Sequence, residues 1–250
     1  MTSLATDLAR SLDPSRLAVD VGFTLDKWQA DLMRSTAPRV LMCCARQTGK
    51  STVASLIAIS TAIGQSNALV LLVSPSQRQS AELFRSLMTH FRRLPGAPEI
   101  KSESVLRVEL ANGSRIVALP GESNTVRGYS GATLIVLDEA ARIADELLAA
   151  VRPMLATSNG RLIALSTPRG KSGWFYTSWH DDSETWHRVR VSAEMCPRIS
   201  KGFLEEELRE LGEQRFQEEY NLAFIEDGDQ VIRDEFFNRA ISKDVCRLWQ

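Results

Sequence analysis

Short runs of apolar residues recur along this chain, and segments long enough for a helix separate them. The clearest runs lie at residues 39–45 (RVLMCCA), 68–73 (ALVLLV), 133–137 (TLIVL) and 161–165 (RLIAL). A run without alternating polar positions has no face for water, which is typical of a strand inside a parallel sheet. Parallel strands need crossover connections. The sequence therefore predicts an α/β fold, with a mostly parallel sheet covered by helices on both faces.

The remaining patterns predict where the other elements lie. An Asn112-Gly113 turn between two alternating segments indicates a β-hairpin, and helical spacing of apolar residues predicts helices within the first 35 residues and in four later segments. The expected hairpin strands are 104–110 and 114–119, a further strand is expected at 186–191, and the later helices are expected at 51–63, 76–92, 145–155 and 201–221.

Charge and composition exclude several classes of protein. The 30 Lys and Arg residues nearly balance 31 Asp and Glu residues, for a net charge of −1, which rules out coating of nucleic acid through net charge alone. The chain has no stretch of 18 apolar residues, which predicts no transmembrane helix and an intracellular location. The cysteines form neither a metal-ligand pattern nor a disulfide framework; they are Cys43, Cys44, Cys196 and Cys246.

A phosphate-binding loop is predicted directly after the first strand. The sequence from Cys44 to Ser51 (CARQTGKS) has the Gly-Lys-Ser of a P-loop, but Cys44 replaces its first glycine. In such loops backbone N–H groups wrap the phosphates, the lysine spans the β and γ oxygens, and the serine hydroxyl binds Mg²⁺. We therefore expect ATP and Mg²⁺ as ligands of the following residues: Arg46, Gln47, Thr48, Gly49, Lys50, Ser51 and Thr52.

Two carboxylates end the apolar run at 133–137. Asp138 and Glu139 follow four consecutive buried-type residues, so we expect both at the carboxyl edge of the sheet, where open α/β folds bind ligands. A strand next to the P-loop strand would bring Asp138 to Mg²⁺, and Glu139 would orient or deprotonate the attacking water.

Three more features fit an ATP-hydrolysing site. Gln29 is a candidate for reading adenine, because an amide both donates and accepts. Ser166, Thr167 and Pro168 end another apolar strand, and we expect them to couple loss of the γ-phosphate to movement. Four arginines are candidates for stabilising transition-state charge: Arg46, Arg127, Arg142 and Arg169. Arg127, in the glycine-rich segment 121–131, is a candidate to act on a neighbouring subunit.

Each feature also has a structural interpretation. The Gly-Lys-Ser sequence could be the N-cap of a helix, and the Asp-Glu pair could lie in a surface turn. Gln29 could belong to the polar face of an amphipathic helix, and Ser166-Thr167 could form a turn capped by Pro168. Any one of the arginines could be a solvated surface side chain. At the level of function, the alternatives are a helicase-like ATPase that depends on nucleic acid, and an assembly module that binds ATP without turnover. A helicase needs a second motor domain, for which about 110 residues after the acidic strand are too few.

The ordered set of motifs resembles the large terminase subunit of tailed bacteriophages. The resemblance covers about residues 20–230 and rests on WQ at 28–29, ARQTGKST at 45–52, RGY at 127–129, LIVLDEA at 134–140, LSTPRG at 165–170, GWFY at 173–176 and FQEEYNLAF at 216–224. It implies a P-loop NTPase core of the additional-strand type, followed by a small helical lid. By the same resemblance, residues 1–195 form the ATPase core with an N-terminal helical segment, and 196–250 form a lid and linker.

The resemblance also implies roles and partners. Lys50 and Ser51 would bind phosphate and Mg²⁺, Asp138 would hold the metal, and Glu139 would be the catalytic carboxylate, with Arg46 and Arg127 as catalytic arginines. The implied partners are double-stranded DNA, the capsid portal protein, the small terminase subunit and further copies of the chain in a ring of five, in the host cytoplasm and away from membranes. Large terminases also carry a nuclease of the ribonuclease H type. We expect no nuclease activity here, and interpret Asp227, Asp229 and Asp234 as linker.

Overall fold

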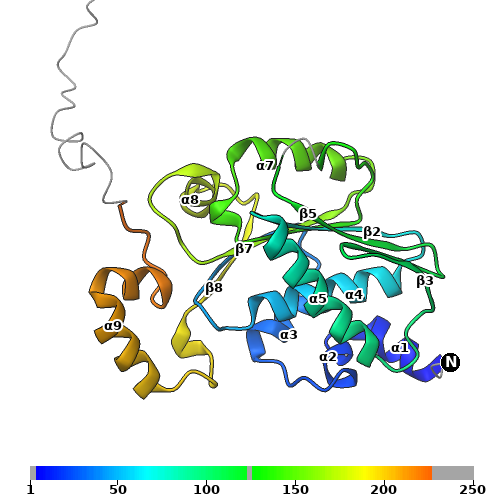
Figure 1. Ribbon diagram of the computed structural model, residues 1–250, viewed down its shortest axis with the longest axis horizontal. Coiled ribbons are helices and arrows are strands. Elements are labelled where there is room, and N and C mark those ends of the chain that lie inside the picture. Colours follow the sequence, from blue (N-terminus) through cyan, green and yellow to red (C-terminus); the bar gives the residue numbers. More distant parts are fainter. Residues whose placement is uncertain (1–3, 123–125, 227–250) are drawn as a thin grey trace, which may run out of the picture.

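The computed structural model describes residues 4–122 and 126–226. One mixed sheet forms the centre of this part of the chain, with strand order β3-β4-β5-β2-β6-β7-β1-β8 (Figure 1). The strands are β1 (Arg39–Cys44), β2 (Leu69–Ser74), β3 (Ile100–Glu103), β4 (Arg107–Leu110), β5 (Arg115–Pro120), β6 (Leu134–Asp138), β7 (Arg161–Ser166) and β8 (His187–Val191). The six strands from β5 to β8 in this order pair in parallel, and β3, β4 and β5 pair antiparallel at one end.

Helices cover both faces of the sheet, as the apolar strands require. Figure 1 shows α7 and α8 on one face and α1 to α5 on the other, with α9 beyond the β8 end. The α-helices are α1 (Leu4–Leu12), α2 (Arg16–Asp20), α3 (Lys27–Arg34), α4 (Lys50–Gly64), α5 (Gln77–Arg93), α7 (Asp145–Val151), α8 (Gly173–His180) and α9 (Lys201–Glu219); 3₁₀ turns are η1 (Ala140–Arg142), η2 (Arg152–Leu155) and η3 (Ala193–Met195).

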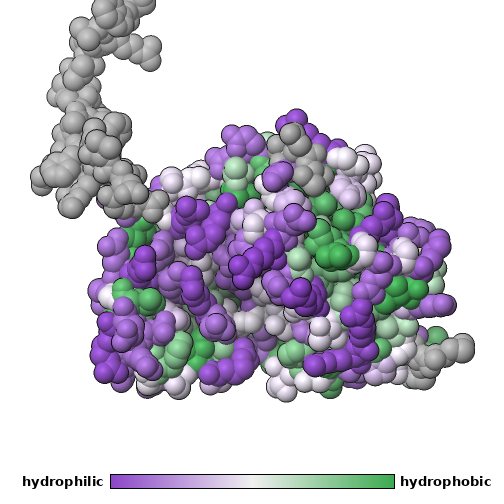
Figure 2. Space-filling view, in the orientation of Figure 1, coloured by the Kyte–Doolittle hydropathy of each residue, from purple (hydrophilic) through white to green (hydrophobic). Residues whose placement is uncertain are grey.

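The apolar strands divide their side chains between two cores. Along β1, Val40 and Met42 pack with α3, α4 and α5, while Leu41 packs on the other face with α7 and α8. A third, smaller cluster joins Cys43 and Ala45 to Phe216 and Tyr220 around α9. Because these three clusters hold apolar side chains inside the fold, the face shown in Figure 2 is mostly hydrophilic. Apolar residues appear on it only in separate patches.

Most predicted elements are confirmed, and several boundaries differ for local reasons. The predicted hairpin forms β4 and β5, but β3 adds a strand that the polar sequence IKSE did not indicate. The helix expected at 145–155 becomes a 3₁₀ turn after Val151, because Pro153 supplies no backbone N–H. The helix expected at 201–221 ends at Glu219 and is kinked at Gly212, whose φ is 74°.

The helix α8 was not predicted from its aromatic-rich sequence. Asp227, Asp229 and Asp234, which were assigned to a linker, lie outside the described residues. Cys246 also lies outside them. Of the remaining cysteines, Cys43, Cys44 and Cys196 are free and buried.

Candidate nucleotide-binding and catalytic site

The pairing of β1, β7 and β6 brings the predicted motifs to one edge of the sheet. Cys43 in β1 lies opposite Ser166 in β7, and Leu165 lies opposite Asp138 in β6. The P-loop, the Ser-Thr segment and the acidic pair therefore leave the sheet together at its carboxyl edge. The expectation that the acidic strand is adjacent to the P-loop strand is wrong. Because β7 pairs with both, two inter-strand spacings of about 4.8 Å each separate β1 from β6.

The P-loop has a backbone that only a few residue types adopt easily. Gly49, immediately before α4, has a φ of 87°, and Gln47 has a φ of 60°; glycine adopts such angles without strain. The buried Thr48 hydroxyl donates to the Ala45 carbonyl at 2.9 Å and closes the turn. Cys44, which replaces the first glycine, is fully buried at the end of β1. Burial raises the pKa of the Cys44 thiol above its ordinary value, so the thiol stays uncharged.

Asp138 is a buried carboxylate that lacks a full set of partners. The Ser51 side chain lies beside it, while its Oδ1 atom has no hydrogen-bond partner in the described part of the chain. Burial, followed by the nearby charge of Glu139, raises the pKa of Asp138 to about 6. An orphaned carboxylate oxygen beside a serine hydroxyl fits Mg²⁺, which prefers oxygen ligands. Ser51 and Asp138 are therefore the residues that would hold the metal.

Glu139 connects the acidic strand to the P-loop. Its carboxylate accepts from the Lys50 ammonium at 2.8 Å and lies 3.6 Å from the Arg142 guanidinium. The Glu139 backbone adopts the left-handed conformation, with a φ of 52°. A non-glycine residue in this conformation is uncommon and often marks a functional site. The turn directs the Glu139 carboxylate toward Lys50, although Lys50 and Glu139 follow strands that are not adjacent.

A cavity of about 570 Å³ lies at this edge of the sheet. It is lined by Arg46, Gln47, Gly49, Lys50, Ser51, Thr52, Gln79, Glu139, Arg142 and Thr167. All of these residues except Gln79 are candidates from the sequence, and Gln79 lies in the first turn of α5. The signal for Gln79 is its position: the helix after β2 begins at the same carboxyl edge, where ligands bind in α/β folds.

The four candidate arginines have different environments. Arg46 lines the cavity, but its guanidinium binds Glu219 at 2.6 Å. Arg142 also lines the cavity and faces Glu139, whereas Arg127 and Arg169 are exposed and do not line it. The Arg127 side chain forms no hydrogen bond or ion pair with any other residue that the structure describes. In this chain alone, Arg46 and Arg142 are therefore the cavity arginines.

The predicted coupling residues and Gln29 lie around the P-loop. Thr167 faces the cavity, Pro168 is buried beside it, and the buried Ser166 hydroxyl has no hydrogen-bond partner among the described residues. Gln29 is buried, accepts from the Asp26 backbone N–H at 2.9 Å and donates to the Gly49 carbonyl at 3.4 Å. Its amide is therefore engaged with the chain, and adenine recognition by Gln29 stays a prediction.

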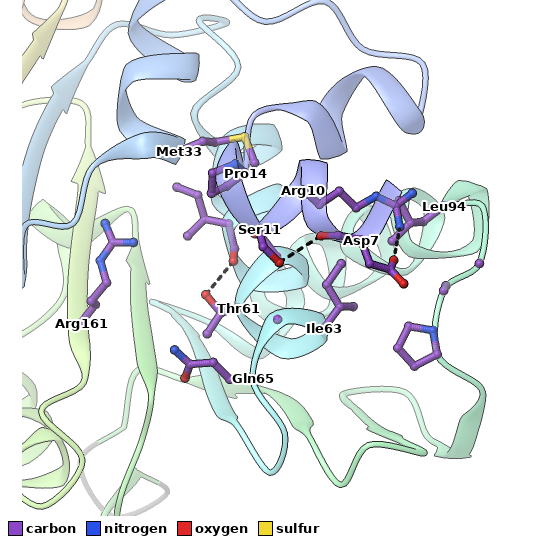
Figure 3. A pocket seen from close by; sticks show the side chains of 16 residues that line it. Asp7, Arg10, Ser11, Pro14, Met33, Thr61, Ile63, Gln65, Leu94 and Arg161 are labelled. Atoms are coloured by element: carbon purple, nitrogen blue, oxygen red, sulfur yellow. Dashed lines mark hydrogen bonds and ion pairs between the residues drawn. The ribbon is translucent and has the colours of Figure 1, made fainter. Parts of the chain in front are cut away.

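A second cavity lies at the opposite edge of the sheet (Figure 3). It has a volume of about 610 Å³ and lies between α1, the C-terminal part of α4 and Arg161, the first residue of β7. Arg10 in its wall is already paired with Asp20 at 2.7 Å. This cavity contains neither the P-loop nor the acidic pair, so its slightly larger volume does not make it the candidate site.

The fold and this site define a P-loop fold of the additional-strand type, in which β7 is inserted between the P-loop strand and the acidic strand. Residues 41–239 match the family model of the terminase large subunit, T4likevirus-type, N-terminal. The chain belongs to this family, and the resemblance inferred from the motifs is confirmed.

Two kinds of relative agree with this assignment. A terminase large subunit of Thermus virus P23-45 is 26% identical over 251 residues, covering 85% of this chain and 51% of the relative. The large terminase ATPase domain of Thermus phage P74-26 superposes with a TM-score of 0.73 at 21% identity, covering 84% of this chain and 98% of that domain. The large terminase of another thermophilic bacteriophage, solved in complex with ADP, superposes with a TM-score of 0.67 at 12% identity, covering 80% and 54% of the two chains.

The chain thus spans about half the length of the curated relative it matches, 51% in the case of the Thermus virus protein. None of the helices in the described residues is long and apolar enough to cross a membrane. Those residues also contain no cluster of three or more His, Cys, Asp or Glu side chains arranged to hold a metal without a further ligand.

Removing the Asp138 charge tests its electrostatic environment. The pKa of Asp138 in the folded chain, about 6, lies above the ordinary 3.8, so the folded state binds more protons between these values. Without metal, ionisation of the Asp138 carboxyl therefore destabilises the folded chain, and the destabilisation reaches its full size above about pH 6. We expect Asp138→Asn to raise the free energy of unfolding at pH 8 by on the order of 1–3 kcal/mol, with a smaller gain at pH 5.

Urea denaturation at both pH values, with a chelator present, measures this difference. Asp182→Asn is the matched control, because Asp182 is an exposed carboxylate, and it should leave stability nearly unchanged. An unchanged or lower stability of Asp138→Asn at pH 8 would contradict the assigned environment.

Proposed function

We propose that this chain binds ATP with Mg²⁺ and hydrolyses it, and that hydrolysis powers the translocation of double-stranded viral DNA into a preformed capsid. The observation that carries the proposal is the 2.8 Å ion pair between Lys50 of the P-loop and Glu139 of the acidic strand. It brings a phosphate-binding cation and a candidate general base to one cavity. Membership of the terminase large subunit family supports this reading, as does a solved family relative that carries ADP.

The two ends of this ion pair have different partners once ATP is bound. The backbone N–H groups of the P-loop and the N-terminus of α4 attract the phosphates, and Lys50 exchanges the Glu139 carboxylate for phosphate oxygens. Glu139, still near Arg142, then becomes free to orient and deprotonate the attacking water. Ser51 and Asp138 would hold Mg²⁺, and the charge of the ion would offset charge that develops on the phosphates.

The strand β7 is well placed to transmit the result of hydrolysis. It lies between the P-loop strand and the acidic strand, and ends at Ser166 and Thr167. Thr167 lines the cavity, so its hydroxyl is a candidate to respond to the γ-phosphate, while Ser166 and Pro168 carry the change into the sheet. Gln29 would read adenine after releasing its present partners.

The larger assembly follows from the family. We propose that the chain acts with double-stranded DNA, the capsid portal protein and the small terminase subunit, as a ring of five copies in the host cytoplasm. Within the chain, residues 1–195 would form the ATPase core and 196–250 a lid with a linker. Arg127 would reach the cavity of a neighbouring subunit, because it is exposed and lies outside the cavity of its own.

Glu139→Gln tests the catalytic step. The amide keeps the shape of the side chain but is not a base, so we expect kcat to fall on the order of 10²-fold or more. Nucleotide binding should be equal or tighter, since Lys50 loses the carboxylate that competes with the phosphates. Phosphate release and the affinity for a fluorescent ATP analogue measure the two effects.

Lys50→Ala serves as the contrasting variant. It removes the charge that binds phosphate and should weaken nucleotide affinity itself. Wild-type turnover in Glu139→Gln, or normal affinity in Lys50→Ala, would be incompatible with the proposed roles.

Mixing two inactive variants tests the role of Arg127. If Arg127 acts on a neighbouring subunit, Arg127→Ala and Glu139→Gln should each be inactive but recover partial ATPase activity together, because a mixed interface contains one intact site. Arginines supplied by a partner contribute roughly 10³–10⁵ in rate in other phosphoryl-transfer enzymes. The specific activity of the wild type should also rise with protein concentration.

The mixture is assayed under conditions in which light scattering shows that the subunits associate. Absence of recovery there would exclude action between subunits. The catalytic arginine would then be sought among the cavity arginines, beginning with Arg46.

A further inference from the structure

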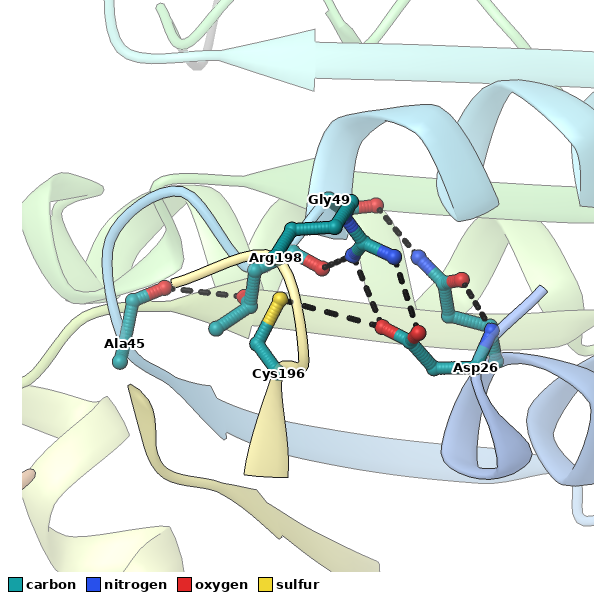
Figure 4. A network of polar contacts seen from close by, with 7 residues as sticks. Asp26, Ala45, Gly49, Cys196 and Arg198 are labelled. Atoms are coloured by element: carbon teal, nitrogen blue, oxygen red, sulfur yellow. Dashed lines mark hydrogen bonds and ion pairs between the residues drawn. The ribbon is translucent and has the colours of Figure 1, made fainter. Parts of the chain in front are cut away.

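Two side chains from outside the P-loop donate hydrogen bonds to its backbone carbonyls (Figure 4). The Arg198 guanidinium donates to the Thr48 carbonyl at 3.2 Å, and the Gln29 amide donates to the Gly49 carbonyl at 3.4 Å. A Cβ atom added to Gly49 would lie 2.8 Å from Gln29 Nε2 and 3.6 Å from Arg198 Nη2, so both side chains lie close against the loop. These contacts are on the loop's carbonyl side, away from the phosphates it would bind.

Arg198 is itself held in place. Its two terminal nitrogens donate to the two oxygens of Asp26 at 2.9 and 2.8 Å, the forked geometry that makes arginine–carboxylate pairs directional. Asp26 is the N-cap of α3 and forms a capping box with Gln29. Arg198, Asp26 and Gln29 therefore form one connected set, here called the P-loop clamp.

The clamp joins parts of the chain that are far apart in sequence. Asp26 and Gln29 belong to the start of α3, whereas Arg198 lies between η3 and α9, 172 residues after Asp26. The P-loop contacts this later segment a second time, because the Arg46 backbone N–H donates to the Glu219 carbonyl at 3.1 Å. The loop is thus held between the N-terminal helices and the segment that carries α9.

Peptide planarity shows what the clamp does to the loop. In a trans peptide the C=O of one residue and the N–H of the next point in opposite directions. Fixing the Thr48 carbonyl outward therefore turns the Gly49 N–H inward. The Gly49 carbonyl accepts from the Val53 N–H of α4 at 3.2 Å as well as from Gln29, and its outward orientation does the same for the Lys50 N–H. Inward N–H groups are what a phosphate-binding loop requires.

We propose that Arg198 is a positioning residue for the P-loop: together with Asp26 and Gln29, it orients the peptide groups of Thr48 and Gly49 for phosphate binding and ties that orientation to the segment leading into α9. The inference rests on the proposed function, because it assigns to the clamp the preorganisation of the same nucleotide site. It also gives Gln29 a role in the nucleotide-free chain that differs from reading adenine.

The chain contains a matched control for the clamp. Arg34 and Asp13 form another forked ion pair, at 3.0 and 2.9 Å, which also involves α3. The Arg34 side chain is 51% exposed and that of Arg198 is 50% exposed. The Arg34 pair makes no contact with the P-loop among the described residues, so Arg34→Ala removes a similar interaction without releasing the loop.

The test compares wild type, Arg198→Ala, Arg198→Lys and Arg34→Ala by the Kd for Mg·ADP, by steady-state kinetics and by Tm. We expect Arg198→Ala to weaken Mg·ADP binding on the order of 10-fold and to raise KM for ATP more than it lowers kcat at saturation. Arg198→Lys, which keeps the charge but loses the fork, should be intermediate. Arg34→Ala should bind Mg·ADP within about twofold of wild type while losing a similar amount in Tm.

The possible outcomes separate the clamp from the proposed function. Wild-type affinity in Arg198→Ala would overturn the clamp and leave the nucleotide site intact. Equal loss of affinity in Arg198→Ala and Arg34→Ala would also overturn it, because general destabilisation would explain both. If Arg198→Ala fails to fold, the Mg·ADP affinities of Arg198→Lys and Arg34→Ala are compared instead. The clamp is overturned if Arg198→Lys keeps wild-type affinity or loses no more than Arg34→Ala. Failure of the wild type to bind Mg·ADP would instead refute the proposed function, and the clamp with it.

Discussion

The register in which β1, β7 and β6 pair decides where the P-loop, the Ser166-Thr167 segment and the acidic pair lie. Parallel strands end at the same edge, and here the P-loop, the Ser166-Thr167 segment and the acidic pair all begin there. Because β7 separates the other two strands, no direct pairing brings the P-loop to the acidic residues. The long side chains of Lys50 and Glu139 span that gap, which makes the site sensitive to the backbone conformation at both ends.

The site is built from charges that are only partly compensated in the described chain. Glu139 has two cations near it, whereas the buried Asp138 has one oxygen without a partner and a raised pKa. Buried charge without a partner is costly, so a cation bound beside Asp138 would relieve a destabilisation that the chain otherwise carries. The P-loop itself is held by contacts on its carbonyl side, above all from Arg198, so its N–H groups remain directed at the cavity.

Much of this was predictable from local sequence, and the exceptions have a common cause. Apolar strands, the Gly49-Lys50-Ser51 loop and the Asp138-Glu139 strand end are encoded within short segments, and the structure brings them together as expected. The order of strands is not local, so the adjacency predicted for the acidic strand was wrong. Arg198 and Asp26 have no motif, and 172 residues separate them; only the folded chain reveals that they meet. The polar edge strand β3 lacks the burial that makes a strand visible in sequence.

The most direct test of this account is a crystal structure of the chain with Mg²⁺ and a non-hydrolysable ATP analogue. The account predicts phosphates in the cavity between the P-loop and Glu139, with the Lys50 ammonium on phosphate oxygens and its 2.8 Å contact to Glu139 broken. An analogue bound elsewhere, for example in the cavity beside Arg161, with the Lys50–Glu139 ion pair intact, would contradict it.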